Sequence, residues 1–148
     1  IIANASRIRK RVGLIMLNVD NFSTIYNQFG TKQANLVLQL TADRLSNNIR
    51  ESDIPARIGS DRFAIIIANL DNEEQLEKLI DSLSEKLAEP IPLTHQQLSI
   101  QASFGSAISP DDDCDIKRLL LTAEQRMNQI KRARHRRSTG NNSYDAAS

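Results

Sequence analysis

Apolar runs alternate with polar, turn-forming segments along the chain and predict a series of strands. The near-continuous apolar run at residues 12–19 is typical of a strand that is buried on both faces. A second apolar run, at residues 64–67, follows a Gly-Ser pair and predicts another buried strand. Alternation of apolar and polar residues over 98–108 predicts one long strand.

Apolar residues spaced three and four positions apart predict helices between these strands. Asp20 or Asn21 is a plausible N-cap for a short helix that runs through Phe29, and Gly30 is suited to end it. Thr31 can cap the helix that follows.

Two further helices are predicted in the second half of the chain. One begins after Asp71 or Asn72 and is stopped by Pro90, and the other spans 116–131. A leading helix is expected to end in the basic segment 6–11. The residues Ile1–Asn4 before it have the composition of a helix interior, which indicates a chain cut from a longer protein.

The resulting order is β-α-α-β-β-α-β-α, which indicates an α+β fold. We expect a central, mostly antiparallel sheet of about five strands flanked by helices. The length of 148 residues suits one domain with a sizeable core. We assign residues 1–137 to this domain and residues 138–148, which have linker composition, to a connection toward a following domain.

Composition narrows the class of protein further. The single cysteine, Cys114, excludes an internal disulfide, and its Asp-rich loop has no second thiol or histidine for zinc. No apolar run approaches the length of a membrane span and no export signal opens the chain, so we expect a cytoplasmic domain. The basic run 131–137 has no interleaved aromatic residues, which favours a solvated helix end over nucleic-acid binding.

The most informative motif is the segment Arg57-Ile58-Gly59-Ser60-Asp61-Arg62-Phe63. A Gly-Ser pair between two β-prone runs predicts a two-residue hairpin turn, because glycine tolerates the positive φ that such turns need. Asp61 is then expected at or just after the tip of the hairpin, as an exposed carboxylate.

This segment resembles the signature hairpin of GGDEF domains, the bacterial family that makes cyclic di-GMP from two GTP molecules. The five signature letters are read here as Gly59, Ser60, Asp61, Arg62 and Phe63. The resemblance extends from about residue 6 to residue 131 and implies the GGDEF fold, which is related to the palm of nucleotide cyclases.

The resemblance also implies that the metal site is degenerate. Family members bind divalent metal through an Asp-x-Asp segment at the end of the first strand and through the third and fourth signature letters. Here the first of these aspartates is Asn18, and the fourth signature letter is the cation Arg62. Because magnesium prefers carboxylate ligands, we expect no bound metal and no other cofactor.

Guanine recognition is altered in the same way. The family reads the base with an asparagine and an aspartate, and the matching positions here are Tyr26 and Asn35. Asn35 cannot accept two hydrogen bonds from guanine as a carboxylate does. The phosphate-contacting lysine of the last helix is matched by Lys131, whereas His135 replaces the arginine four residues later.

Many cyclases carry an inhibitory Arg-x-x-Asp site that binds cyclic di-GMP, and Arg50 and Asp53 match it. A local ion pair that caps a helix end is the structural alternative for these two residues. Asp81 stands where the family often completes the site with an arginine.

Three functions remain open at this point. The leading hypothesis is a catalytically inactive GGDEF domain that acts as a regulatory or interaction module in bacterial cyclic di-GMP signalling. Its expected partners are an EAL-type phosphodiesterase domain in the same chain, other signalling proteins, or a second copy. The alternatives are a cyclic di-GMP receptor that uses Arg50 and Asp53 and, with least support, an active diguanylate cyclase.

Overall fold

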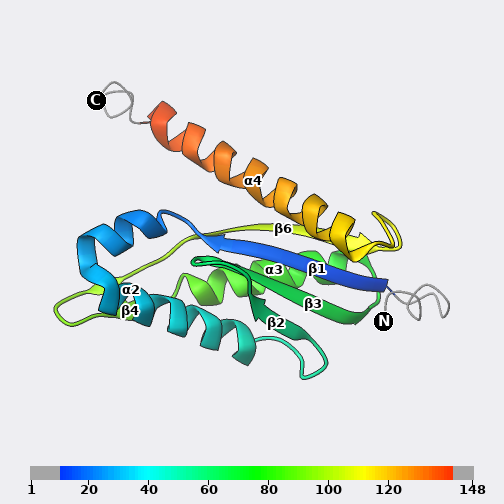
Figure 1. Ribbon diagram of the computed structural model, residues 1–148, viewed down its shortest axis with the longest axis horizontal. Coiled ribbons are helices and arrows are strands. Elements are labelled where there is room, and N and C mark those ends of the chain that lie inside the picture. The colour runs from blue at the N-terminus through cyan, green and yellow to red at the C-terminus, as the bar shows by residue number, and fades with distance from the viewer. Residues whose placement is uncertain (1–10, 142–148) are drawn as a thin grey trace.

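The computed structural model describes the backbone of residues 11–141 and the side chains of residues 11–134. Its core is a four-stranded sheet in the order β2-β3-β1-β6, with every neighbouring pair antiparallel (Figure 1). The strands are β1 (Arg11–Val19), β2 (Ile54–Arg57), β3 (Arg62–Leu70) and β6 (Ala102–Ser109). The predicted α+β fold with a flanked antiparallel sheet is therefore confirmed.

Two helices cover the first face of the sheet. They are α2 (Phe22–Asn47) and α3 (Glu73–Leu87), and their apolar stripes meet the alternate strand residues that point to this side. Asn72 caps α3 as predicted, because its side chain accepts a hydrogen bond from the Gln75 backbone N–H at 2.8 Å. The residues of this larger core that are less than 2% exposed include Ile15, Leu17, Ile65, Leu76 and Leu83.

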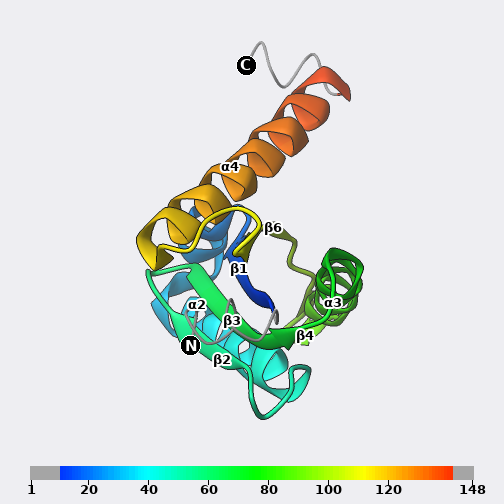
Figure 2. The same cartoon turned by 90° about the vertical axis from the view of Figure 1, so that its right-hand side faces the viewer.

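The second face carries a smaller core beneath α4 (Ile116–Asn141). Leu119, Ala123 and Met127 of this helix are fully buried against Leu14 and Met16 of β1. The helix packs mainly on β6 and β1, and Figure 2 shows it on the opposite side of the sheet from α3. The two long helices α2 and α4 thus belong to separate cores.

The central sheet has four strands where about five were predicted, and the predicted strand 98–108 is divided into two strands. Gln97–Leu98 forms β5, which pairs with β4 (Ile91–Pro92) in a separate two-stranded sheet. The ladder to β1 begins only at Ala102, since β1 ends at its partner Val19. Ile100 turns into the first core between the two strands.

The predicted break at Gly30 is present, because this residue takes the non-helical φ 85° and ψ 170° and divides α2 into two helical segments at a kink. Other boundaries differ from the predictions at two places. Arg11 belongs to β1, whereas the rest of the predicted leading helix lies outside the described residues. The last helix continues past the predicted end to Asn141, which includes the start of the predicted linker. The remainder of that linker lies outside the described part of the chain.

Polar side chains cover the outer edge of β6. Asp112 accepts a hydrogen bond from the Ile108 backbone N–H at 2.8 Å and pairs with Arg126 of α4 at 2.9 Å. Arg126 also donates to the Ser106 carbonyl oxygen at 2.7 Å. The hydrogen bond from Arg126 lowers the pKa of Asp112 and raises that of Arg126. These contacts satisfy backbone groups that would otherwise offer an open strand edge.

The close approach of α4 to β6 depends on Gly105. A Cβ atom at this position would collide with the backbone of Ala123 and Met127. We therefore expect Gly105→Ala to push the helix away and cost about 1–3 kcal/mol of unfolding free energy. The melting temperature should fall by roughly 3–10 °C, measured by circular dichroism.

Gly59→Ala is the matched control, because its added Cβ would meet nothing closer than the Arg62 Cβ at 3.4 Å. The melting temperature of this control should stay within about 1 °C of the wild-type value. Equal stability of the two variants would contradict the close helix packing.

Candidate functional site

The candidate site lies where β1 ends beside the β2–β3 hairpin. Asn18 pairs in register with Arg62 of β3 on one side and with Ser103 of β6 on the other. The Val19 backbone N–H donates to the Asp61 carbonyl oxygen at 3.0 Å, which ties the hairpin to the end of β1. The fold thus brings together the altered metal position and the hairpin, as the sequence predicted.

The hairpin turn differs from the prediction. The Ile58 backbone N–H donates to the Arg62 carbonyl oxygen at 2.9 Å, which leaves Gly59, Ser60 and Asp61 as a three-residue turn. Gly59 does not take the predicted positive φ, since Gly30 is the glycine with that conformation in the described residues. The Arg57 guanidinium holds the turn by donating to the carbonyl oxygens of Gly59 at 3.0 Å and Ser60 at 2.8 Å.

Arg62 is directed toward α4. Its guanidinium pairs with the Glu124 carboxylate at 2.9 Å, and both side chains are about one-third exposed, at 37% and 35%. The positive charge that replaces a family carboxylate is therefore compensated by an anion from the last helix. This ion pair connects the hairpin strand to α4.

Asp20 is also held by α4. Its carboxylate accepts hydrogen bonds from the Ser103 hydroxyl at 2.8 Å and from the Arg134 guanidinium at 3.1 Å, and its side chain is 10% exposed. Arg134 donates in addition to the Ala102 carbonyl oxygen. Asn21 occupies the N-cap position of α2, but its side chain makes no capping bond. Asp20 thus serves the contact with α4, and neither residue caps α2 through its side chain.

Asn18 is 2% exposed, and its side-chain oxygen has no hydrogen-bond partner among the described residues. Buried polar groups are usually hydrogen-bonded, so this unpartnered oxygen is an unusual feature of the end of β1. It belongs to a neutral amide, with Arg62 on the neighbouring strand.

These donors do not fit the magnesium ion that the resemblance implies. The available oxygens are one neutral amide, the Asp20 carboxylate, which is already paired with Arg134, and the Asp61 carboxylate, which lines the pocket beside Tyr26. The cations Arg62 and Arg134 lie where an added dication would be repelled. In residues 11–134, no group of three or more His, Cys, Asp or Glu side chains could hold a metal ion.

The two positions matched to guanine recognition line one pocket. Tyr26 and Asn35 of α2 surround a space of about 370 Å³ together with Asp61 of the hairpin. Tyr26 is 45% exposed. Its hydroxyl accepts a hydrogen bond from Thr31 at 2.9 Å, across the kink of α2. The pocket thus brings together the two positions that the resemblance matched to guanine recognition, and the residue at the second of them is the neutral Asn35.

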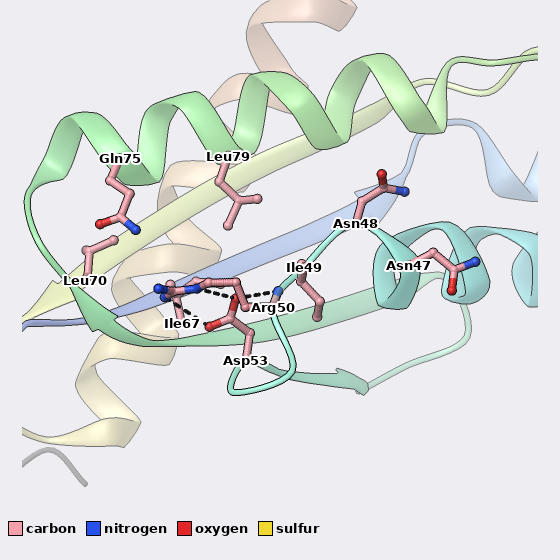
Figure 3. Close-up of a pocket in the computed structure, with 9 residues that line it drawn as sticks. All are labelled: Asn47, Asn48, Ile49, Arg50, Asp53, Ile67, Leu70, Gln75 and Leu79. Carbon is pink, nitrogen blue, oxygen red and sulfur yellow. Dashed lines mark hydrogen bonds and ion pairs between the residues drawn. The ribbon is translucent and has the colours of Figure 1, made fainter.

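Arg50 and Asp53 lie in a different pocket, of about 450 Å³, between the end of α2, β3 and α3 (Figure 3). Asp53 is 5% exposed and accepts hydrogen bonds from the backbone N–H groups of Arg50 at 3.0 Å and Ala68 at 3.2 Å. Arg50 donates to the Ala68 carbonyl oxygen at 2.5 Å and contacts Asp53 at 3.4 Å. The pair therefore hydrogen-bonds both backbone groups of Ala68 at the edge of β3. Ala68 lies beyond the first residue of β2, so Arg50 and Asp53 take the place of a further strand residue there.

Sequence reasoning missed the contributions of Glu124, Arg134 and Ser103 to the site. Arg134 was assigned to a solvated basic run, yet its side chain is only 32% exposed and bridges two strands. Lys131 is exposed, and the side chain of His135 lies outside the described residues. The sequence did contain a signal for Arg134. The stripe of the last helix, with spacings i, i+3 and i+4, continues through Met127 to Arg134, which places Arg134 on the side of the helix that faces the sheet.

The sequence of this chain matches a known protein family. Residues 1–137 match the family model for the diguanylate cyclase GGDEF domain. The chain therefore belongs to the GGDEF domain family, whose members occur in cyclic di-GMP signalling proteins.

Solved structures agree with this assignment. The GGDEF domain of TpbB from Pseudomonas aeruginosa superposes with a TM-score of 0.86 at 27% identity, covering 89% of this chain and 83% of that one. The active GGEEF domain of a diguanylate cyclase from Vibrio cholerae gives a TM-score of 0.80 at 27% identity, over 88% of this chain and 83% of that one.

Among the curated relatives, the cyclic di-GMP phosphodiesterase NbdA of Pseudomonas aeruginosa is 29% identical over 82% of this chain. This chain covers only 16% of the length of NbdA, and only 20% of the bifunctional diguanylate cyclase/phosphodiesterase MucR. Relatives of this domain thus include much longer proteins with different activities. In the part of the chain that the structure describes, no helix has the length and hydropathy needed to cross a bilayer.

The contacts of Asp53 predict a structural role that can be measured without any ligand. Asp53→Asn should remove the negative charge that strengthens the hydrogen bonds to two part-buried backbone N–H groups, replace one acceptor oxygen by an NH₂ group, and cost roughly 1.5–3 kcal/mol. The melting temperature should fall by about 4–10 °C. Asp81→Asn, an exposed change on α3, is the control and should shift it by less than about 1 °C. A normal melting temperature for Asp53→Asn would remove the structural assignment.

Proposed function

We propose that this domain is a catalytically inactive GGDEF domain that acts as a regulatory and interaction module in bacterial cyclic di-GMP signalling. We also infer that it works in the cytoplasm, where nucleotide second messengers are made and read. The observation that carries the proposal is the engagement of Asp20 by Arg134, combined with the replacement of a metal-binding aspartate by Asn18.

Joining a 3′-hydroxyl to an α-phosphate requires divalent metal to neutralise charge and to lower the pKa of the hydroxyl. At this edge the carboxylate of Asp20 is neutralised by an internal guanidinium, and Arg62 brings a second positive charge. At about 4 Å and an effective dielectric constant of 20, each unit-charge pair is worth around 4 kcal/mol. A metal ion that binds here would have to displace the guanidinium of Arg134 from Asp20, and it would still be repelled by the guanidinium of Arg62.

An interaction role is supported by the two ion pairs that join α4 to the site, Arg62–Glu124 and Arg134–Asp20. This helix contacts the remnant site through Glu124 and Arg134 and continues to Asn141. Since a helix transmits a change in packing as a rigid-body shift, α4 is the physical route toward a neighbouring domain. An EAL-type domain in the same chain is the partner we propose first, with other signalling proteins or a second copy as alternatives.

We assign a structural role to Arg50 and Asp53 in place of cyclic di-GMP reception. A guanine edge would need the carboxylate of Asp53, which is buried and already accepts two backbone hydrogen bonds. Ligand binding there would have to break the contacts that complete the edge of β3.

The purified chain should make no cyclic di-GMP from GTP and Mg²⁺, as measured by liquid chromatography against a reaction without enzyme. The physical reason is the absence of a metal-binding set at Asn18, Asp20 and Arg62. The active GGEEF domain of the diguanylate cyclase from Vibrio cholerae, assayed under the same conditions, controls for the reagents. Product above the no-enzyme background, made by the wild type and lost in Asp61→Ala, would overturn the proposal.

A further inference from the structure

The two halves of α4 are held to the sheet in different ways. The first half carries the buried apolar side chains of the described part of the helix, which are Leu119, Ala123 and Met127. These side chains pack in the second core, and the ion pair of Arg126 with Asp112 lies in the same half. The first half of the helix is therefore fixed by apolar burial as well as by polar contacts.

The second half of α4, residues 128–141, is much more exposed where its side chains are described. Every residue from 128 to 134 is exposed or only partly buried. Ile130 follows Met127 by three residues, on the same side of the helix, yet it is 44% exposed. Figure 2 shows the helix leaving the sheet toward this end. Within residues 128–134, apolar packing therefore contributes little to the position of the helix.

Arg134 connects this half of the helix to the sheet. Its guanidinium donates to the Asp20 carboxylate at 3.1 Å and to the Ala102 carbonyl oxygen, and it contacts the Ser103 hydroxyl at 3.4 Å. Among residues 128–134, Arg134 is the one whose side chain makes a hydrogen bond or an ion pair with β6 or with the end of β1. The attachment of this half is thus concentrated in one polar side chain.

Such an attachment can open while the rest of the domain stays folded. Segments with few buried apolar contacts open at a lower free energy than the whole domain unfolds. The Arg134 side chain is 32% exposed, so water can replace its hydrogen bonds when it leaves. Asp20 retains its hydrogen bond from the Ser103 hydroxyl at 2.8 Å, and its own backbone N–H remains bonded to the Gln101 carbonyl oxygen at 2.7 Å. Opening therefore leaves both cores in place.

We propose that residues 128–141 form a releasable arm, which the contact between Arg134 and Asp20 holds closed. In the closed state the arm covers the Asp20 carboxylate, whose side chain is 10% exposed, and in the open state this carboxylate is uncovered. The inference rests on the proposed role as a regulatory module and names the contact that a neighbouring domain would break by moving α4. Movement of the arm leaves Leu119, Ala123 and Met127 packed in the second core.

The test uses the complete 148-residue chain and amide hydrogen exchange followed by nuclear magnetic resonance, which reports local opening residue by residue. Arg134→Gln removes the guanidinium and introduces a side chain of similar helix propensity. The amides of residues 130–137 should exchange at least about tenfold faster in this variant, because the arm opens more often. The amides of residues 119–127 should change by less than about twofold, since their part of the helix stays packed.

Arg132→Gln is the matched control, because it removes the same charge from an exposed position in the same half of the helix. It should change the exchange of residues 130–137 by less than about twofold. Asp20→Asn tests the contact from the other side and should accelerate exchange of the same amides. The double variant Asp20→Asn/Arg134→Gln should show less than the sum of the two effects, because both changes remove one contact.

The wild type provides a test that needs no substitution. Raising the NaCl concentration from about 0.05 M to about 0.5 M should accelerate the exchange of residues 130–137 by about threefold relative to residues 119–127, because salt screens a partly exposed ion pair. Equal acceleration of both halves would contradict an arm that is held by charge.

Three results from the variants would overturn the proposal. Unchanged exchange of residues 130–137 in Arg134→Gln would show that Arg134 does not hold this half. Acceleration that is as large in β1 as in residues 130–137 would show that Arg134 supports the whole fold, and equal acceleration by Arg132→Gln would assign the effect to charge alone. Hydrogen exchange is measured without GTP, so failure of the arm is distinguishable from failure of the proposed catalytic inactivity.

Discussion

The contact between Arg134 and Asp20 is the interaction on which the organisation of the site depends. It joins the last helix to the end of β1, and the same guanidinium reaches the first residue of β6. A cation from the protein itself thus lies against a carboxylate at the edge where the family places metal ligands. This contact holds α4 against the end of β1, and in the proposed function it also opposes the binding of a dication.

The ion pair between Arg62 and Glu124 extends the same arrangement to the hairpin. The signature segment is connected to α4 instead of a metal ion, and the Val19–Asp61 hydrogen bond keeps it next to β1. Because α4 supplies one partner of each ion pair, Glu124 to Arg62 and Arg134 to Asp20, a movement of α4 would affect β3 and the end of β1 together.

The local pattern of apolar and polar residues predicted much of the fold but few of the contacts at the site. The apolar run of β1 and the capped, proline-terminated helix α3 are encoded by neighbouring residues, which explains why their prediction succeeded. The break before Ala102 depends on where β1 ends, so it could not be seen in the alternation of 98–108. Arg134 and Asp20 are 114 positions apart, and a basic run read locally suggests only solvation. The residues of the degenerate site were identifiable from the motif, but their new partners required the tertiary structure.

Manganese titration followed by nuclear magnetic resonance tests the central claim most directly, because paramagnetic Mn²⁺ broadens the signals of nearby amides and substitutes for magnesium at carboxylate sites. If internal arginines have replaced the metal, the backbone amide signals of Asn18, Asp20 and Asp61 should broaden no more than those of exposed acidic positions such as Asp81. Selective broadening centred on Asn18 and Asp20 at low Mn²⁺ concentration would show that a metal displaces Arg134, and would contradict the account.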